Sequence, residues 1–350
     1  MTSSIPRQMK AWQYSQTTGG LERNLKYNPT AALPSNATSL PADKTLVQVI
    51  SATLNPVDYK FPEVPFVSRF LIGQPASPGQ DYAGRVIATG PNTKKVSSQD
   101  LRPGQLVFGR VDRPNKFGPL AEYIVASRAG CVPVPEGVSP DHAAGVATAG
   151  MTAYQCIVPN VEPGQRIFIN GGSGGTGTFG IQIAKVKGCF VVASCSTPNV
   201  DLCKSLGADE VIDYKKQDLA AELTRLGMFD LVVDNVGTPA ELFWQARHFL
   251  KEGAKWVQPA AGFGLGDIRA LAARSLWPKF LGGGTAKFEF LKVVNNYDQA
   301  MELGRWMQEG KVKAVIDEVF GMEDKGPVKA FERMKTGRAR GKIVVRVAEQ

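Results

Sequence analysis

Alternating hydrophobic and polar positions are frequent in the first 135 residues of the chain. Such alternation suits strands with one buried face, and prolines and glycines interrupt it at short intervals. We expect strands at 9–14, 45–52, 85–89, 103–109 and 120–125. Because no long helical pattern lies between them, this part of the chain predicts a small, barrel-like β-rich domain with a few short helices.

From about Asp141 the pattern changes to alternating strands and helices. Small residues at helical spacing cover 143–153, and helix-like segments follow at 199–206 and 240–250. The apolar runs between the helices predict strands at 167–170, 190–194, 210–213, 230–234, 255–258 and 288–294. Strands that alternate with helices form parallel sheets covered on both faces, so we expect a doubly wound α/β domain here.

The last part of the chain returns to the first pattern. We expect a helix at 297–307 and strands at 314–320 and 342–346. These two strands are expected to join the β-rich domain. The predicted domains are therefore 1–135 together with 295–350, and 136–294.

A glycine-rich loop separates the predicted strand 167–170 from the helix that follows it. Gly172, Gly174 and Gly177 have the G-x-G-x-x-G spacing, in which the first glycine makes a tight turn, the second admits a pyrophosphate and the third lets helix and strand pack closely. The helix start adds unpaired N–H groups and a positive dipole end. This setting favours dinucleotide binding over a plain flexible loop. The expected contacts are Gly172, Ser173, Gly174, Gly175, Thr176 and Gly177.

Composition narrows the class of protein. A chain of 350 residues suits about two domains. No apolar run approaches the ~18 residues that span a membrane, and the first residues lack a secretory or arginine-rich presequence, so we expect a cytoplasmic protein. The five cysteines form no C-x-x-C pair, which argues against a disulfide framework and a thiolate zinc site. The formal charge of +9 is spread along the chain, which favours a basic surface and anionic ligands over nucleic acid.

Six motifs follow one another along the chain. They are Asn55-Pro-Val-Asp58, Pro78-Gly-Gln-Asp-Tyr-Ala-Gly84, Ala149-Gly-Met-Thr-Ala153, the glycine loop, Leu206-Gly-Ala-Asp209 with Val211-Ile-Asp-Tyr214, and Asp234-Asn-Val-Gly237. Together they resemble the medium-chain dehydrogenase/reductase superfamily, specifically its zinc-free quinone oxidoreductase-like and enoyl reductase-like branches. The resemblance covers nearly the whole chain and implies a GroES-like β-rich domain beside a Rossmann domain with a doubly wound parallel sheet.

The same resemblance bears on zinc. In zinc-dependent relatives a cysteine, a histidine and a further cysteine or aspartate hold the catalytic metal. This chain has Asn55, Gln80 and Gly145 at or near those positions, and none of them suits zinc. The four closely spaced cysteines of a structural zinc site are also missing from the sequence. We therefore expect a zinc-free enzyme without metal ligands.

The end of the second strand of the parallel sheet decides between NADPH and NADH. An NAD-selective site places Asp or Glu there, about 20 residues after the loop, whereas this strand ends in Ser194-Cys-Ser-Thr-Pro198. An uncharged, hydroxyl-bearing pocket tolerates a 2′-phosphate, and the resemblance adds Asn199 and Tyr214 to Ser196 as its contacts. Helix capping by Ser196 or Asn199 and a surface ring for Tyr214 are the alternatives. NADPH is the expected cofactor.

The resemblance implies three further cofactor contacts. Thr152 lies where relatives contact the nicotinamide end, and Asn235 belongs to the Asp234–Gly237 motif. Lys342, in a Gly-Lys pair of the last predicted strand, is the third candidate. A surface charge is the alternative for Lys342.

Without a metal, hydride delivery depends on positioning and on hydrogen bonds to the developing oxyanion or enolate. We expect Asn55 as a neutral donor, Asp58 as a carboxylate that orients its neighbours, and Tyr59 as a donor or weak acid. Turn capping by Asn55 and Asp58 and core packing of Tyr59 are the alternatives.

The sequence thus predicts an NADPH-dependent oxidoreductase that transfers a hydride to a quinone or to an activated, α,β-unsaturated double bond. Two alternatives stay open. One is a trans-acting enoyl reductase that serves a carrier domain of a polyketide synthase, and the other is a non-enzymatic NADPH-binding sensor or scaffold. The expected substrate is a small molecule, namely a quinone, an enone or an enoyl thioester. No membrane span or nucleic-acid partner is expected, and the resemblance favours a homodimer.

Overall fold

The computed structural model describes residues 5–64, 66–91, 101–112, 114–237, 239–259, 262, 264–277 and 284–349. The chain divides into two compact units. The first unit contains Met1–Thr148 and Asn295–Gln350, and the second contains Ala149–Val294. Among the described residues, no helix is both long enough and apolar enough to span a bilayer.

The described strands of the first unit form a seven-stranded sheet and a separate two-stranded one. The larger sheet has the order β14-β15-β3-β4-β5-β7, with β6 also paired to β3. All its strand pairs are antiparallel except β14 with β15. The bounds are β1 (Gln8–Gln13), β2 (Lys26–Ala32), β3 (Lys44–Leu54), β4 (Asp81–Thr89), β5 (Leu106–Arg110), β6 (Tyr123–Ser127), β7 (Cys131–Pro133), β14 (Ile316–Gly321) and β15 (Lys342–Arg346).

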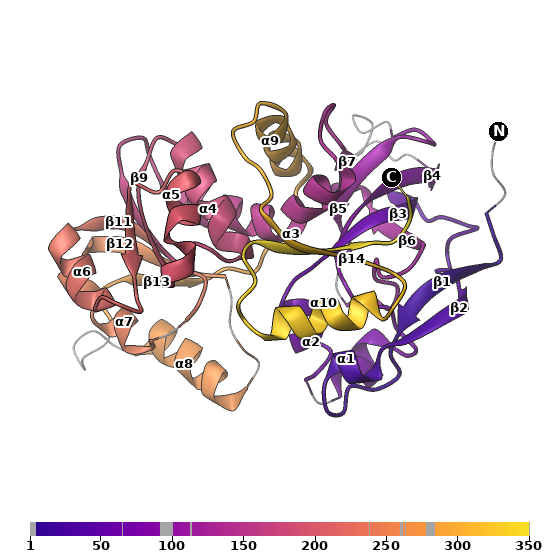
Figure 1. Cartoon of the computed structure of the whole chain (residues 1–350), viewed down its shortest axis with the longest axis horizontal. Helices are drawn as coiled ribbons and strands as arrows, with labels where there is room; N and C mark the ends of the chain where they lie inside the picture. The colour runs from indigo at the N-terminus through magenta and orange to yellow at the C-terminus, as the bar shows by residue number, and fades with distance from the viewer. Residues whose placement is uncertain are drawn as a thin grey trace. The chain divides into compact units, whose positions relative to one another are not determined.

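Strand β3 is the centre of the larger sheet because it pairs with β15, β4 and β6. Its sequence is rich in β-branched and apolar residues, and most of them are buried. The register places Thr53 opposite Asp81 of β4, and Leu54 opposite Ile343 of β15. In Figure 1 the yellow C-terminal strands accordingly run beside the indigo and purple strands of the N-terminal part. The expected return of the last two strands to the β-rich unit is confirmed.

Short helices complete the first unit. One of them, α10, packs through Phe331 on a core that includes Trp12, Leu54 and Ile343. The bounds are α1 (Leu21–Asn24), α2 (Val57–Lys60), the π-helix η1 (Val67–Ile72), η2 (Arg128–Gly130), α9 (Tyr297–Gln308) and α10 (Gly326–Lys335). The hydrophobic contact of α10 with β15 fixes the C-terminal strand against the sheet.

The second unit is built on a six-stranded sheet with the order β10-β9-β8-β11-β12-β13. All pairs of strands are parallel. The central strands are almost continuously buried, as expected for a sheet covered on both faces. The bounds are β8 (Arg166–Asn170), β9 (Phe190–Cys195), β10 (Glu210–Asp213), β11 (Phe229–Asp234), β12 (Leu250–Gln258) and β13 (Lys287–Phe290). The doubly wound order reverses at β8, where the glycine loop begins.

Helices of the second unit follow the strands in the expected alternation (Figure 1). The bounds are α3 (Pro140–Ile157), η3 (Val158–Asn160), α4 (Gly175–Val186), η4 (Thr197–Asn199), α5 (Val200–Ser205), α6 (Leu219–Leu226), α7 (Glu241–Trp244), η5 (Ala246–His248) and α8 (Leu265–Leu276). Helix α3 begins in the first unit and ends in the second.

Several predicted elements have different limits in the structure. The strands expected at 85–89, 103–109 and 120–125 are observed at Asp81–Thr89, Leu106–Arg110 and Tyr123–Ser127. The helical segment expected at 240–250 ends at His248, because Leu250 pairs with Phe229 and so begins β12. The strand expected at 288–294 ends at Phe290, because its partner strand β12 ends at Gln258. The first unit boundary lies after Thr148, inside α3, rather than after residue 135. The assignment of functional domains stays a prediction.

Candidate functional site

The glycine loop joins strand β8 to helix α4. A Cβ atom added to Gly172 would lie 2.8 Å from Ala193 Cβ, and one added to Gly177 would lie 2.1 Å from the Gly171 carbonyl oxygen. Both positions therefore require glycine for packing. At Gly174 an added Cβ would lie 3.7 Å from the Gly171 carbonyl oxygen, an ordinary contact, so packing within the free protein does not require glycine at this position.

The tight turn of the loop is made by Gly171, which has φ +78°. Gly172, predicted to make this turn, lies within it, and its lack of a side chain also allows the close approach of Ala193 in β9. Gly175 begins α4, and the hydroxyl of Thr178 donates to its carbonyl at 3.0 Å. The first-turn N–H groups of this twelve-residue helix have no intrahelical acceptor, which suits a phosphate.

Three residues predicted from the sequence meet at the end of β9. The Asn199 side-chain amide donates to Ser173 Oγ at 3.0 Å and to Ser196 Oγ at 3.2 Å. Asn199 is thus bonded across to the glycine loop, and the cluster carries no charge. It is an uncharged group of hydroxyls and an amide at the position where an NAD-selective site carries an acid.

Tyr214 follows β10 and its side chain is 48% exposed. The Tyr214 backbone N–H donates to the carbonyl of Cys195 at 3.2 Å, which ties it to the same strand end. Lys215, a cation that the sequence analysis missed, has its ammonium 5.6 Å from the centre of the Tyr214 ring. Its position directly after Tyr214, a predicted site residue, is the signal in the sequence that could have identified Lys215.

A polar network links the carboxyl ends of β9, β8 and β11. The Ser194 hydroxyl donates to Asn170 Oδ1 at 2.7 Å, and the Asn170 amide donates to Asp234 Oδ1 at 2.8 Å. Asn235 donates to the Asn170 carbonyl at 3.1 Å. The buried Asn235 Oδ1 has no hydrogen-bond partner among the described residues. An orphaned acceptor on a residue that lies against Gly171 of the glycine loop fits a nicotinamide dinucleotide, which would be held by this edge of the sheet.

Asn55, predicted as a donor to substrate, lies in a buried network at the end of β3. Its Oδ1 accepts a hydrogen bond from Lys342 Nζ at 2.6 Å, and its Nδ2 donates to Asp81 Oδ2 at 2.8 Å. The ammonium on one side and the carboxylate on the other fix the orientation of the amide. The other N–H group of Nδ2 has no partner among the described residues.

Lys342 is not the surface charge that the sequence analysis considered, because it is 2% exposed. Its ammonium donates to Leu54 O at 3.0 Å, Asn55 Oδ1 at 2.6 Å and Asp81 Oδ2 at 3.2 Å. An ammonium has three N–H groups, so these contacts occupy all of them. Lys342 therefore holds the Asn55 amide in place, and the cofactor contact implied by the resemblance stays a prediction.

Asp81 and Thr148 complete this network and were missed as site residues. Both the backbone N–H and the hydroxyl of Thr148 donate to Asp81 Oδ1. Thr152, the predicted nicotinamide contact, lies one turn further along α3 and is also buried. The available signal for Asp81 was a carboxylate at the start of a strand whose next residues, Tyr82, Ala83 and Gly84, suit a buried position.

Asp58 and Tyr59 lie on the short helix α2. The Asp58 carboxylate accepts the backbone N–H of Asn55 at 2.8 Å, which is the turn capping considered as the alternative, and its catalytic role stays a prediction. Tyr59 is partly buried, and the Lys335 ammonium lies 4.9 Å from the centre of its ring. Burial raises the pKa of the Tyr59 phenol, partly offset by Lys335. The phenol is therefore protonated at neutral pH.

The residues at this position do not fit zinc. Among the described residues, no group of three His, Cys, Asp or Glu side chains could hold a metal ion. The Lys342 ammonium, 3.2 Å from Asp81, supplies a fixed positive charge where a metal would need anionic ligands.

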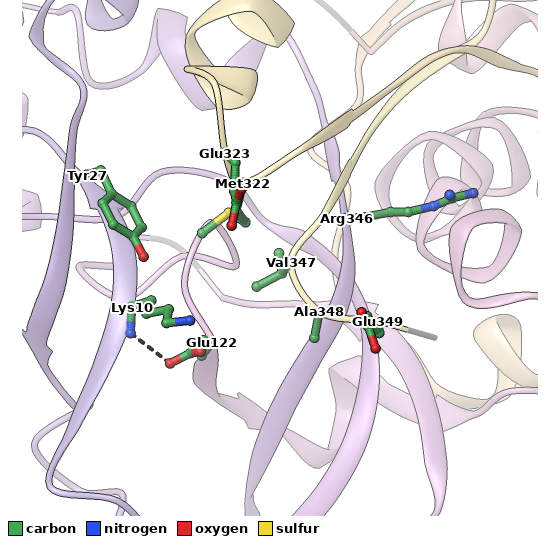
Figure 2. Close-up of a pocket in the computed structure, with 9 residues that line it drawn as sticks. All are labelled: Lys10, Tyr27, Glu122, Met322, Glu323, Arg346, Val347, Ala348 and Glu349. Atoms are coloured by element: carbon green, nitrogen blue, oxygen red, sulfur yellow. Dashed lines mark hydrogen bonds between the residues drawn. The ribbon is translucent and has the colours of Figure 1, made fainter.

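A surface depression of about 630 Å³ lies elsewhere in the first unit (Figure 2). The backbone N–H of Lys10 donates to a Glu122 carboxylate oxygen at 2.7 Å along its wall (Figure 2). Its lining mixes acids and bases and includes no site residue predicted from the sequence. The lining residues are Lys10, Tyr27, Glu122, Met322, Glu323, Arg346, Val347, Ala348 and Glu349.

Comparison with known proteins identifies the family of this chain. The family model described as an alcohol dehydrogenase GroES-like domain matches residues 41–136, and the one described as a zinc-binding dehydrogenase matches residues 206–345. A trans-enoyl reductase, pgmF from Aspergillus terreus, is 56% identical over 100% of this chain and 99% of the relative. An NADPH-dependent alkenal/one oxidoreductase (chloroplastic) from Arabidopsis thaliana is 32% identical over 98% of this chain and 81% of the relative. The solved quinone oxidoreductase from Coxiella burnetii has a TM-score of 0.80 at 28% identity, covering 97% of this chain and 99% of that structure.

The chain therefore belongs to the medium-chain dehydrogenase/reductase superfamily, and it is an oxidoreductase. Within the superfamily it belongs to the quinone oxidoreductase-like and enoyl reductase-like branch. The predicted fold class, a GroES-like β-rich domain with a Rossmann parallel-sheet domain, is confirmed. Reductases of this superfamily bind a nicotinamide cofactor, which fits the glycine loop described above.

Proposed function

We propose that this chain is a zinc-independent, NADPH-dependent reductase of activated carbon–carbon double bonds or quinones. The observation that carries the proposal is the fixed amide of Asn55, held between Lys342 and Asp81 without a metal-ligand set. The names of the Aspergillus, Arabidopsis and Coxiella proteins support the same reaction class.

The preference for NADPH rests on the uncharged cluster at the end of β9. Ser173, Ser196 and Asn199 offer donors to a 2′-phosphate and no carboxylate that would repel it. Lys215 adds a positive charge beside Tyr214. The Arabidopsis relative, which is named as NADPH-dependent, supports the same preference.

The chemistry divides between cofactor and protein. The nicotinamide cofactor supplies the hydride when bound. The free N–H of Asn55 then donates to the carbonyl oxygen of the acceptor, where negative charge develops during the reaction. Lys342 and Asp81 hold this donor in place, so the reorganisation of the amide is complete before the substrate binds.

Tyr59 supplies the candidate proton. Because burial raises its pKa, the phenol stays protonated at neutral pH and could donate to the product carbanion or enolate. We expect Tyr59→Phe to keep the fold and to lower turnover. Unchanged turnover in a folded Tyr59→Phe protein would assign the ring to packing beside Lys335.

A second candidate function is enoyl reduction in trans, for a polyketide synthase. It is favoured by the 56% identity to a protein named as a trans-enoyl reductase across the whole of this chain. In this case the acceptor is an enoyl thioester on a carrier domain rather than a free small molecule.

The test is NADPH oxidation by the purified protein with 2-cyclohexenone, menadione, a crotonyl-N-acetylcysteamine thioester and the same crotonyl group on an isolated carrier domain, with NADH in parallel. Turnover of free enone or quinone with NADPH preferred supports the first proposal. Turnover confined to the carrier-bound thioester supports the second. NADPH binding without turnover of any acceptor contradicts both and points to a sensor or scaffold.

A further inference from the structure

Gln80 has an unusual side-chain environment in the first unit. The residue is 1% exposed, and neither Nε2 nor Oε1 has a hydrogen-bond partner among the described residues. A buried amide without partners loses its hydrogen bonds to water and gains none in return, which destabilises the folded protein.

The side-chain amide of Gln155, another buried glutamine, has hydrogen-bond partners within the protein. Gln155 donates from Nε2 to the Val294 carbonyl at 2.9 Å and accepts at Oε1 from the Val294 N–H at 3.1 Å. Both ends of that amide are therefore satisfied by protein. Gln80 lacks such partners, so its amide is suited to a group that is not part of the chain.

The backbone holds Gln80 in place on both sides. Gly79 before it has φ +101°, a conformation that favours glycine, and the Gln80 carbonyl accepts the Val111 N–H at 3.0 Å. The next residue is Asp81, whose carboxylate binds Asn55 and Lys342. Gln80 thus directly precedes, along the chain, the carboxylate of the network that positions the proposed substrate donor.

We propose that Gln80 is a substrate-binding residue whose Nε2–H donates to the carbonyl oxygen of the electron-poor acceptor. The inference rests on the proposed reductase function. A carbonyl acceptor satisfies the Nε2 donor, and the Oε1 acceptor is matched by a hydroxyl or water that enters with the substrate. The unpartnered Gln80 amide lowers the stability of the free protein, and a bound substrate supplies the missing hydrogen bond.

The test uses Gln80→Met, which keeps the length of the side chain and removes both polar atoms, with Gln155→Met as the matched control. Thermal unfolding of the cofactor-free proteins is measured first. We expect Gln80→Met to unfold at a higher temperature than the parent, and Gln155→Met at a lower one, because only the second change breaks hydrogen bonds within the protein. A lower unfolding temperature for Gln80→Met would show that its amide is satisfied in the folded protein and would overturn the proposal.

Substrate binding is measured next on protein saturated with NADP⁺, which has no hydride to deliver. Titration with the crotonyl-N-acetylcysteamine thioester and 2-cyclohexenone is expected to give a Kd about tenfold weaker for Gln80→Met, at an unchanged Kd for NADP⁺. An unchanged substrate Kd in a variant of an active parent overturns the role of Gln80 alone. A parent that reduces none of the acceptors overturns the proposed function, while the unfolding comparison still decides whether the Gln80 amide is unsatisfied.

Discussion

The side-chain amide of Asn199 lies 3.0 Å from the hydroxyl oxygen of Ser173 and joins the glycine loop to the segment that follows β9. Two parts of the dinucleotide site that are 26 positions apart in the sequence are therefore linked before any ligand binds. Ser196, which accepts from the same amide, belongs to this link. A change at Ser196 should consequently affect cofactor choice more than folding.

We expect Ser196→Asp to weaken NADPH binding by about tenfold or more, since a carboxylate at the end of β9 repels the 2′-phosphate. Binding of NADH should be maintained or improved, because the acid can accept from the ribose hydroxyls. Fluorescence titration with both cofactors checks this. Ser205→Asp, on the exposed end of α5, is the control and should change neither affinity. Equal loss of NADPH and NADH binding would show that Ser196 does not determine the preference between the two cofactors.

Substitutions of the loop glycines should distinguish a position that matters for folding from one that matters for cofactor binding. Gly177→Ala places a Cβ 2.1 Å from a backbone oxygen and should cost about 1–3 kcal/mol in the free energy of unfolding. Gly174→Ala has room in the free protein and ordinary backbone angles, so its stability should stay within about 0.5 kcal/mol of the parent. Its affinity for NADPH should nevertheless fall by about tenfold, because the added methyl group occupies the approach to the pyrophosphate.

Urea unfolding without cofactor and NADPH titration measure these two effects. Gly321→Ala in the first unit, where a Cβ would have no neighbour closer than 3.9 Å, is the control for glycine replacement itself. If Gly174→Ala bound NADPH as tightly as the parent, the pyrophosphate would have to lie elsewhere.

Replacing Asp81 and Lys342 together should separate the effect of this buried ion pair on stability from its effect on the Asn55 amide. Asp81→Asn or Lys342→Met alone leaves one buried charge without its partner, and each should lower the free energy of unfolding by about 3–5 kcal/mol. The double variant has no such charge and should recover most of that loss. Because it no longer holds the Asn55 amide, its kcat should be about tenfold lower at an unchanged Kd for NADPH. A weaker Kd for NADPH in the folded double variant would instead make Lys342 a cofactor ligand.

The Lys335 ammonium provides a test of pH dependence. It binds the carboxylates of Glu22 and Glu63. Burial lowers the pKa of Lys335, but the hydrogen bonds and charges of these two carboxylates outweigh burial, so the pKa is raised overall. A folded-state pKa above the unfolded value contributes stability that is complete below the unfolded pKa, about 10.4, and is lost as the pH rises through the raised pKa.

We therefore expect Lys335→Met to be less stable than the parent by about 1 kcal/mol at pH 7 and pH 9, because the ammonium is only partly exposed. The difference should shrink at pH 11 and above. Urea unfolding at these pH values measures it, with the exposed Lys329→Met on the same helix as the control. A difference that grew with rising pH would contradict the assigned sign.

The sequence alone was sufficient for the fold and for one part of the site. The parallel-sheet unit was predictable because its strands are nearly continuous apolar runs separated by helical segments, and because the loop from Gly172 to Gly177 has a fixed spacing. The role of Lys342 was not predictable. Its neighbours Asn55 and Asp81 are more than 250 positions away in the sequence, and only the pairing of β15 with β3 brings them together. The sequence placed Gln80 at the position of a zinc ligand of relatives, but the lack of partners for its amide among the described residues was not predictable, since a missing hydrogen bond has no sequence pattern.

The C-terminal strand β15 has a consequence for synthesis. Strand β3 and the Asp81 carboxylate leave the ribosome long before Lys342, so during translation the sheet lacks one central neighbour and the carboxylate lacks its ammonium. The second unit is continuous in sequence and can complete its fold in that interval. The Asn55 network can therefore form only after β15 has emerged, and a nascent chain halted before β15 would contain the second unit but not the contact of Lys342 with Asn55.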